Sequence, residues 1–326
     1  MDWSTLVIPI AVLGALALFR FVGCTFTPTG IVSQPYADDV LLDNPLVYYR
    51  LQETIGSTTA TDETGHLNAL YGVAPGPLNN ADYFSLPIST PSLQLGADSV
   101  MQKDQTDLSV RFNGSFVSTQ GQGALSALGD LSQFTADILV HPEWDVANER
   151  NFYCVLDYSN YVAGIGPPGP NRNAGFAIYA GPDSPSDPTT PICWQLWIGT
   201  GNEFLRALPL DGGPGPLVLP EDTYLAVQFG PTQAFLWAYT VNADVDQVKF
   251  ELEVPPYVQP TDPNPANIPF NIGISQNFAA LFSPFPGPNG FIYPFVGRMA
   301  EAALYNTVLD GGRLMSHIMN AFNTTS

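Results

Sequence analysis

The sequence predicts an all-β sandwich, preceded by one membrane-spanning helix and followed by a short C-terminal helix. Charged residues make up 12% of the 326 residues, about half of the usual share, while 29 glycines and 31 prolines favour turns over long surface helices. Short apolar runs are separated by clusters of Gly, Pro, Asn and Asp, which is typical of strands and turns. One uncharged stretch near the N-terminus approaches the length that crosses a bilayer.

Acidic residues outnumber basic residues by 30 to 10, which gives a formal net charge of -20. A partner that is held by its phosphate groups requires a positive field, so we exclude nucleic-acid binding. The apolar share of 45% is enough for a buried core in a chain of this length.

The N-terminal stretch carries no charge from Ser4 to Phe19. We predict that residues 1–24 form an uncleaved single-pass anchor in membrane lipid, with Gly14 as a small surface for another helix. A cleaved signal peptide is one alternative, although no basic residue precedes the apolar run. Lipidation of Cys24, after a lipobox-like segment, and a buried core helix are the others. The anchor residues are Leu6, Val7, Ile8, Ile10, Val12, Leu13, Gly14, Leu16, Leu18 and Phe19.

Residues 25–38 are polar, contain two prolines and read as a linker that spans up to roughly 45 Å when extended. The folded domain is expected over residues 39–326. Long acidic domains translocate largely regardless of a single nearby Arg, and residues 113–115 form a glycosylation sequon. We therefore place the domain on the extracytoplasmic side, periplasmic or extracellular.

Nine apolar runs predict strands. They cover residues 46–51, 109–114, 134–142, 151–159, 174–181, 192–199, 224–230, 234–241 and 270–275. Proline-rich loops between them are either rigid surface connections or docking surfaces for neighbouring chains. Near the C-terminus, Leu314, Ile318 and Phe322 lie at spacing four, which predicts an amphipathic helix. Cys154 and Cys193 both fall in predicted strands, where they either form a disulfide outside the cytosol or stay separate buried thiols.

Two segments, residues 43–71 and 297–322, resemble the opening and closing signatures of laminin-G-like, concanavalin A-like jelly-roll domains. The opening match is carried by Asp43, Pro45, Tyr48, Tyr49, Arg50, Leu51, Glu53, Gly56, Asp62 and Gly65. The closing match is carried by Gly297, Glu301, Leu304, Tyr305 and Asn306, with Ala300 where an Asp is usual. The resemblance implies a concanavalin A-like jelly roll over nearly the whole domain.

Within the opening segment, we expect Arg50 and Glu53 to pair across the strand, and Gly56 and Gly65 to occupy turns with positive φ. Calcium is the ligand that the resemblance implies most readily. Its candidate ligands are Asp62, with nearby carbonyls, and Asp157, beside Asn160; each is alternatively a turn stabiliser.

Catalysis is not expected. Glycan-cleaving relatives carry three acids at alternating positions of one strand, whereas Glu251 and Glu253 lack the third and read as exposed edge residues. The histidines show no zinc spacing, and no GxSxG motif is present. Trp194, Trp197 and Trp237 are expected in the core, with stacking on sugars as the alternative.

These observations predict a non-catalytic, membrane-anchored accessory subunit whose jelly roll binds or scaffolds other subunits of a larger membrane assembly, such as a photosynthetic or respiratory complex. The alternatives are a surface lectin that binds glycans with calcium, and a structural protein of a virion or surface layer. No cofactor other than calcium is expected.

Overall fold

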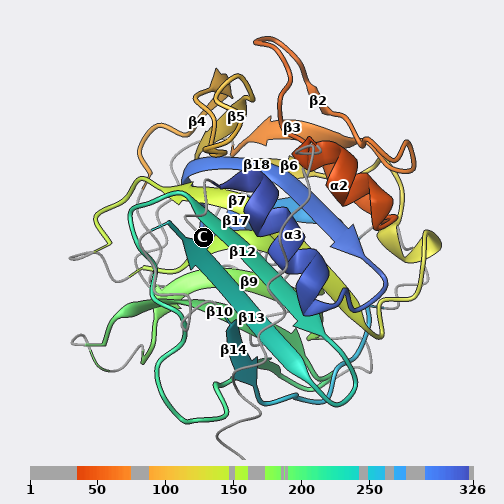
Figure 1. Cartoon of the computed structure of the whole chain (residues 1–326), viewed down its shortest axis with the longest axis vertical. Coiled ribbons are helices and arrows are strands. Elements are labelled where there is room, and N and C mark those ends of the chain that lie inside the picture. Colours follow the sequence, from red (N-terminus) through yellow and green to blue (C-terminus); the bar gives the residue numbers. More distant parts are fainter. Residues whose placement is uncertain are drawn as a thin grey trace, which may run out of the picture. The chain divides into compact units, whose positions relative to one another are not determined.

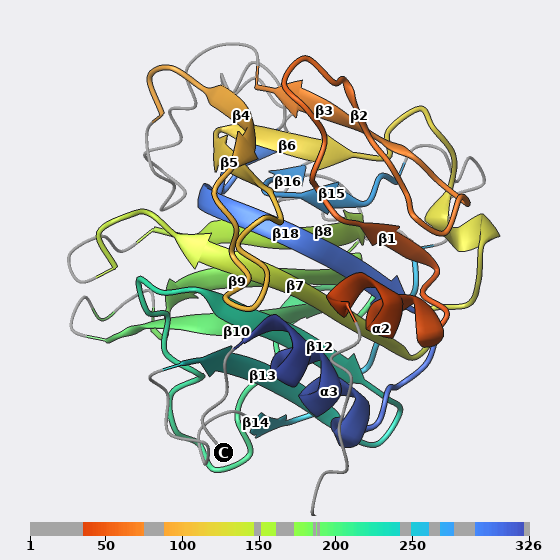
Figure 2. The same cartoon turned by 45° about the horizontal axis from the view of Figure 1, so that its top comes forward.

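Two antiparallel β-sheets pack face to face, and two short helices lie on the outer face of one of them (Figures 1 and 2). The computed structural model describes residues 35–74, 88–146, 151–160, 173–184, 187, 190–241, 249–260, 268–276 and 291–322. The all-β sandwich predicted from the sequence is therefore confirmed. The predicted anchor, with Cys24, lies outside these ranges, and none of the helices within them is long and apolar enough to cross a membrane.

Sheet A has the strand order β14-β13-β12-β7-β18-β5-β4, and β1 pairs with β18. Its strands are β1 (Val47–Tyr49), β4 (Ser92–Ala97), β5 (Ser109–Asn113), β7 (Phe134–Pro142), β12 (Thr223–Phe229), β13 (Ala234–Thr240), β14 (Lys249–Leu252) and β18 (Val296–Tyr305). The last strand of the chain thus lies between β7 and β5, and the first strand pairs with it.

Sheet B has the order β11-β10-β9-β8-β15-β6-β3-β2. Its strands are β2 (Thr59–Ala60), β3 (Ala69–Val73), β6 (Ser115–Ser118), β8 (Tyr153–Asn160), β9 (Ala174–Pro182), β10 (Ile192–Gly199), β11 (Phe204–Arg206) and β15 (Asn271–Ile272). A separate hairpin joins β16 (Ser275–Gln276) to β17 (Phe291–Ile292), and a 3₁₀ turn covers Leu125–Ala127.

The predicted strand at residues 270–275 is divided into β15 and β16. Gly273 lies between the two with a φ of 84°, and a Cβ at this position would lie 2.7 Å from the Phe112 ring. Only glycine combines this backbone conformation with so close an approach. The interruption therefore reflects the chain's close passage over Phe112.

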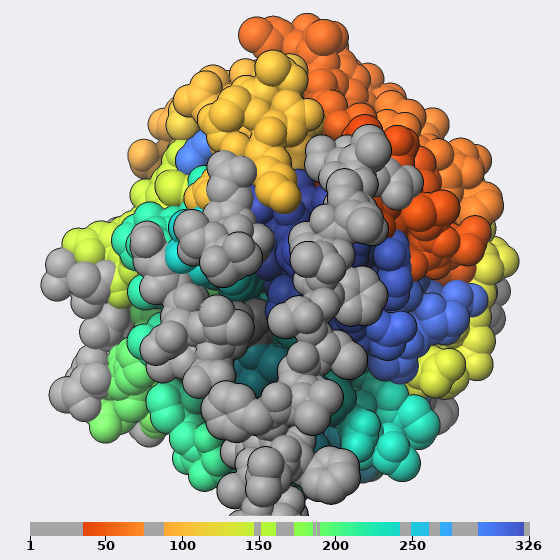
Figure 3. Space-filling model, in the orientation of Figure 1, coloured from red at the N-terminus to blue at the C-terminus, as the bar shows by residue number. Residues whose placement is uncertain are grey.

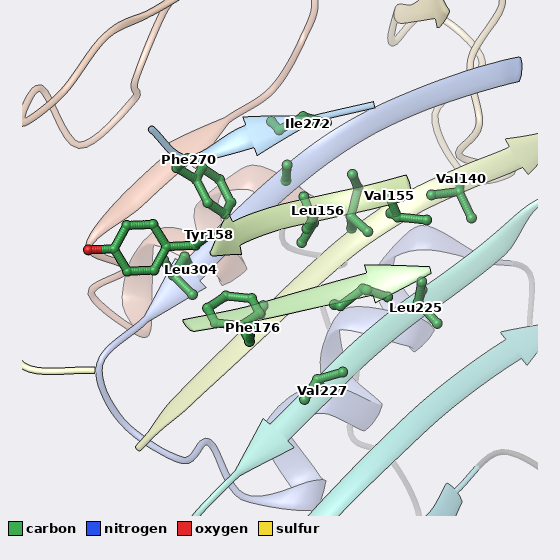
Figure 4. Packing of buried hydrophobic residues seen from close by; sticks show 14 of the residues in the cluster. Val140, Val155, Leu156, Tyr158, Phe176, Leu225, Val227, Phe270, Ile272 and Leu304 are labelled. Carbon is green, nitrogen blue, oxygen red and sulfur yellow. The ribbon is translucent and has the colours of Figure 1, made fainter. Parts of the chain in front are cut away.

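The main core fills the space between the sheets (Figure 4). Val140, Leu225 and Val227 from sheet A meet Val155 and Phe176 from sheet B, and all five are fully buried. Each such side chain contributes about 1.5–3 kcal/mol relative to an exposed position. Along each strand the alternate residues point to the outer face, so the strands set which side chains are available for binding.

Helices α2 (Tyr36–Leu42) and α3 (Gly311–Ala321) lie side by side on the outer face of sheet A (Figures 2 and 3). The predicted domain boundary at residue 39 falls inside α2. Helix α3 confirms the predicted C-terminal helix, and Asp310 caps it by accepting a hydrogen bond from the Arg313 N–H at 2.9 Å. Leu314 and Ile318 are fully buried against the sheet.

Candidate functional site

A buried acid–base cluster joins the two helices to sheet A. We use this name for Asp39 and Asp43 of α2, Asp137 of β7, and Arg313 and His317 of α3. Asp137 is flanked by Ala226 and Ala303 on the neighbouring strands, so its carboxylate has room to face the helices. The four side chains other than Arg313 are at most 10% exposed, and Arg313 is 31% exposed. The sequence pattern did not indicate that these five residues lie together.

His317 lies at the centre of the cluster. Its Nδ1 is 2.9 Å from Asp137 Oδ2, and its Nε2 is 3.0 Å from Asp43 Oδ2. Burial alone would lower the pKa of the imidazole, but the hydrogen bonds to Asp137 and Asp43 outweigh it and raise the pKa to about 9. The ring is therefore a buried cation between two carboxylates at neutral pH.

Arg313 extends the cluster to the first helix. Its Nε donates to Asp43 Oδ1 at 2.8 Å, and its NH2 donates to Asp39 Oδ1 at 2.7 Å. Burial opposes ionisation of Asp39, yet hydrogen bonds from Ser316, Arg313 and Asn320 keep its pKa below the usual value. These contacts hold α3 against α2.

A second network joins the two segments that carry the family resemblance. Glu301 is fully buried, and it accepts hydrogen bonds from Arg50 Nε at 3.2 Å, from Gln52 Nε2 at 3.0 Å and from the Tyr48 hydroxyl. Arg50 also pairs with Asp107 at 3.1 Å. Burial raises the pKa of Glu301.

The expected pair between Arg50 and Glu53 is wrong. The Glu53 carboxylate instead accepts from the Thr61 N–H at 2.6 Å and from the Tyr71 hydroxyl. Glu301 lies on a β-bulge with a φ of 57°, which turns its side chain toward β1 and makes it the partner of Arg50. The turn glycines are confirmed, with φ values of 96° at Gly56 and 75° at Gly65.

Both networks are structural in character. Asp137, Glu301 and His317 are fully buried, so they cannot contact a ligand from solvent. Charged groups in such positions are kept only when they are paired and hydrogen-bonded, and removal of one partner is costly. These three side chains are therefore not part of the surface on which an external ligand could bind.

Asp62, a predicted calcium ligand, organises the loop between β2 and β3. Its two carboxylate oxygens accept hydrogen bonds from four backbone N–H groups, those of Tyr48, Thr64, His66 and Leu67, and from the Thr64 hydroxyl. The N–H groups turn their positive ends toward the carboxylate, which is the wrong polarity around a cation. The groups around Asp62 therefore do not fit calcium, and the Asp62 carboxylate stabilises the turn, which was the alternative interpretation.

Asp157, the second predicted calcium ligand, lies on the outer face of sheet B and is 1% exposed. Its carboxylate accepts from the hydroxyls of Ser159 at 2.5 Å and Ser275 at 2.9 Å. Within the described ranges, no group of three or more His, Cys, Asp or Glu side chains is arranged to hold a metal ion. Calcium binding at Asp157 remains a prediction.

The two cysteines of the described domain are separate, buried thiols. Cys154 lies on β8 opposite Tyr179, and Cys193 lies on β10 opposite Gly181, so β9 separates them. Of the two alternatives given for Cys154 and Cys193, the structure has the separate buried thiols and not the disulfide. Burial raises the pKa of Cys193 to about 12, which keeps this thiol protonated at neutral pH.

Of the three candidate tryptophans, only Trp197 lies on an outer face with part of its ring exposed. Trp194 is in the core between the sheets, and Trp237 packs against the helices on sheet A. The difference follows from strand periodicity, because residues 194 and 197 of one strand point to opposite faces. The alternation was readable in the sequence, but it does not tell which face is covered.

Trp197 and Phe204 form what we call the aromatic platform, on the outer face of sheet B. The rings are nearly parallel, with centroids 6.3 Å apart and an interplanar angle of 18°, and both are half-buried. Tyr179 and Phe152 pack edge-on against Trp197 and fix its plane. Trp197 Nε1 donates to Gln195 at 2.9 Å. Phe204 belongs to β11, a strand of three residues that the sequence pattern did not reveal.

Polar groups border the platform. Arg206 is the cross-strand partner of Trp197, and it is held by Asp183. At the turn between β10 and β11, Glu203 is exposed and Asn173 Nδ2 donates to the Asn202 carbonyl at 2.7 Å. The two rings are thus rigid and partly exposed, and an arginine lies beside them on the same face of the sheet.

The remaining candidate acids lie away from the platform. Glu251 and Glu253 are exposed at the edge of sheet A, as expected for edge residues. Another acid, Glu143 directly after β7, forms ion pairs with Arg111 and Arg298.

Several solved structures are similar to this chain. Domain 4 of AbnA, an extracellular arabinanase of Geobacillus stearothermophilus in complex with arabinotriose, is 14% identical over 84% of this chain and 97% of that chain, with a TM-score of 0.46. The CBM40 domain of a Ruminococcus gnavus sialidase, bound to α2,3 sialyllactose, is 12% identical over 69% and 96%, with a TM-score of 0.38. The binding domain of botulinum neurotoxin serotype D/C is 9% identical over 85% and 52%, with a TM-score of 0.42. No protein-family model and no curated protein matches the sequence.

Proposed function

We propose that this protein is a non-catalytic binding module of the concanavalin A-like, laminin-G-like type, and that its ligand is a carbohydrate bound on the aromatic platform. The supporting observation is the parallel, half-buried pair of Trp197 and Phe204. The C–H groups of a sugar ring pack against an aromatic face, while its hydroxyls require polar partners at the border.

The polar border supplies such partners. Arg206, the cross-strand partner of Trp197, lies on the same face, and the exposed residues Asn202 and Glu203 belong to the turn that joins the two strands of the platform. The rings lose little conformational freedom on binding, because Phe152 and Tyr179 already hold Trp197. The platform is therefore already ordered before a polar ligand of low affinity binds.

The test is a glycan array probed with the full-length protein, followed by calorimetric titration of the glycans that bind. Trp197→Ala and Phe204→Ala should each weaken binding at least tenfold. Phe235→Ala is the matched control, because Phe235 is a half-buried ring on the opposite sheet. The proposal fails if no glycan binds, or if the control variant loses as much affinity as the platform variants. A chelator arm tests the predicted calcium dependence.

We propose as a second function that the domain is the extramembrane part of an anchored accessory subunit of a larger membrane assembly. The uncharged run from Ser4 to Phe19 favours it. In this case the protein should resist extraction with alkaline carbonate and, after gentle detergent treatment, should have a native mass well above that of one 35.1 kDa chain. Release into buffer as a free monomer would contradict this second function and leave the first intact.

A further inference from the structure

The only described basic side chain beside the aromatic platform is Arg206, and it is already occupied. Its NH1 donates to the Asp183 carbonyl and its NH2 donates to Asp183 Oδ1, both at 2.5 Å. The Arg206 side chain is 12% exposed, against 26% for Asp183. Asp183 thus covers the two terminal nitrogens with which a guanidinium binds a carboxylate ligand.

The other described basic side chains are likewise already in contact with acceptors or aromatic rings. Each described Lys and Arg side chain contacts a carboxylate, a backbone carbonyl or an aromatic ring; these are Arg50, Lys103, Arg111, Arg206, Lys249, Arg298 and Arg313. Glu203 adds an exposed negative charge in the turn next to Phe204, and the whole chain has a formal charge of -20. An anionic ligand would approach against this field.

From these contacts we infer that the platform selects neutral saccharides over acidic ones, and that Asp183 is the residue that sets this specificity. The inference rests on the proposed carbohydrate-binding function. A sialic acid or uronic acid carboxylate would have to displace Asp183 from Arg206 before it gained an ion pair. A neutral sugar needs no such exchange, because stacking on Trp197 and Phe204 leaves the Arg206–Asp183 pair in place.

The test compares matched neutral and acidic probes, lactose with sialyllactose and galactotetraose with tetragalacturonate, by titration of the full-length protein. The wild-type protein should bind the neutral member of a pair at least tenfold more tightly. Asp183→Asn removes the competing carboxylate. It should bind the acidic probe more tightly and so reduce the ratio of neutral to acidic affinity at least tenfold. Adding Arg206→Gln to Asp183→Asn should abolish that gain.

Glu251→Gln is the matched control, since it removes one exposed negative charge on the other sheet and should leave the preference unchanged. Thermal unfolding of each variant checks that it is folded. Tighter binding of the acidic probes by the wild type would overturn the inference, as would an unchanged preference in folded Asp183→Asn. Both of those results leave carbohydrate binding itself standing, whereas failure of every probe and every array glycan would refute the proposed function together with the inference.

Discussion

Replacing His317 by Gln tests the acid–base cluster, because the amide keeps hydrogen-bonding groups near Asp137 and Asp43 but carries no charge. In the folded protein the pKa of His317 is about 9, against an ordinary value of 6.5. At about 1.4 kcal/mol per pH unit, this difference corresponds to about 3 kcal/mol of unfolding free energy. The side chain is fully buried, so solvent screening does not reduce this figure greatly.

The pKa of His317 is higher in the folded state than in the unfolded state, so its contribution to the unfolding free energy decreases as the pH rises. The folded state binds the imidazole proton more tightly than the unfolded state, so the contribution is fully present below pH 6.5 and is lost as the pH rises through about 9. The wild-type protein should therefore lose about 3 kcal/mol between pH 6 and pH 9.5 from this residue alone. The His317→Gln protein should lack that part of the pH dependence.

The assay is urea unfolding of both proteins at half-unit pH steps from 6 to 9.5, with the difference in unfolding free energy plotted against pH. Other groups that titrate in this range, such as Asp107, whose pKa burial raises to about 7, contribute equally to both proteins and cancel. The difference should be largest at pH 6 and shrink toward pH 9.5. A difference that stays constant over this range would refute the assignment of a charged His317 to the folded state.

Three further predictions concern the frame of the sandwich. Gly175→Ala should cost at least about 2 kcal/mol of unfolding free energy in thermal unfolding, because the added Cβ would lie 2.0 Å from the Tyr158 carbonyl oxygen and the φ is 92°. Gly56→Ala is the control, since Gly56 has a similar φ but no atom within 4 Å of the added Cβ, and it should cost about 1 kcal/mol. Glu301→Ala should cost about 3–5 kcal/mol in urea unfolding, since it leaves the buried Tyr48 hydroxyl without its acceptor and removes one of the two carboxylate partners of Arg50. A loss below about 1 kcal/mol would be inconsistent with the network. Pro209→Val should promote self-association in light scattering, because Pro209 pairs with Leu252 at the edge of sheet A and presents no N–H outward; a variant that stays monomeric at high concentration would argue against edge protection.

The strands that were predicted well are those whose pattern is set by burial. The run at 134–142 and the run at 192–199 coincide with β7 and β10, because both are long, mostly apolar segments bounded by turn residues. Strands β2, β3, β4 and β11 were not predicted, and the run predicted at 270–275 is divided into β15 and β16. Strands of two or three residues have too few positions for alternation to be read, and their pairing is decided by partners distant in the sequence.

The candidate site was less predictable for the same reason. Trp197 was a candidate among three tryptophans, but its exposure depends on which outer face the helices cover, and α2 was absent from the prediction. Arg50 was assigned to the nearest acid, Glu53, whereas its partner Glu301 is separated from it by almost the whole domain and is presented by a bulge. Local patterns predicted the elements, and the contacts between distant elements determined the site.

The central claim, that a saccharide binds on Trp197 and Phe204, is tested most directly by the indole N–H signals of the five tryptophans in a ¹⁵N-labelled protein titrated with a bound glycan from the array. Trp197 Nε1 is the reporter, since Trp144, Trp194 and Trp237 are buried. We predict that the Trp197 signal shifts in a saturable manner, with the affinity found by calorimetry, while the signals of Trp194 and Trp237 stay in place. A glycan that binds with the Trp197 signal unmoved would contradict the platform as the site.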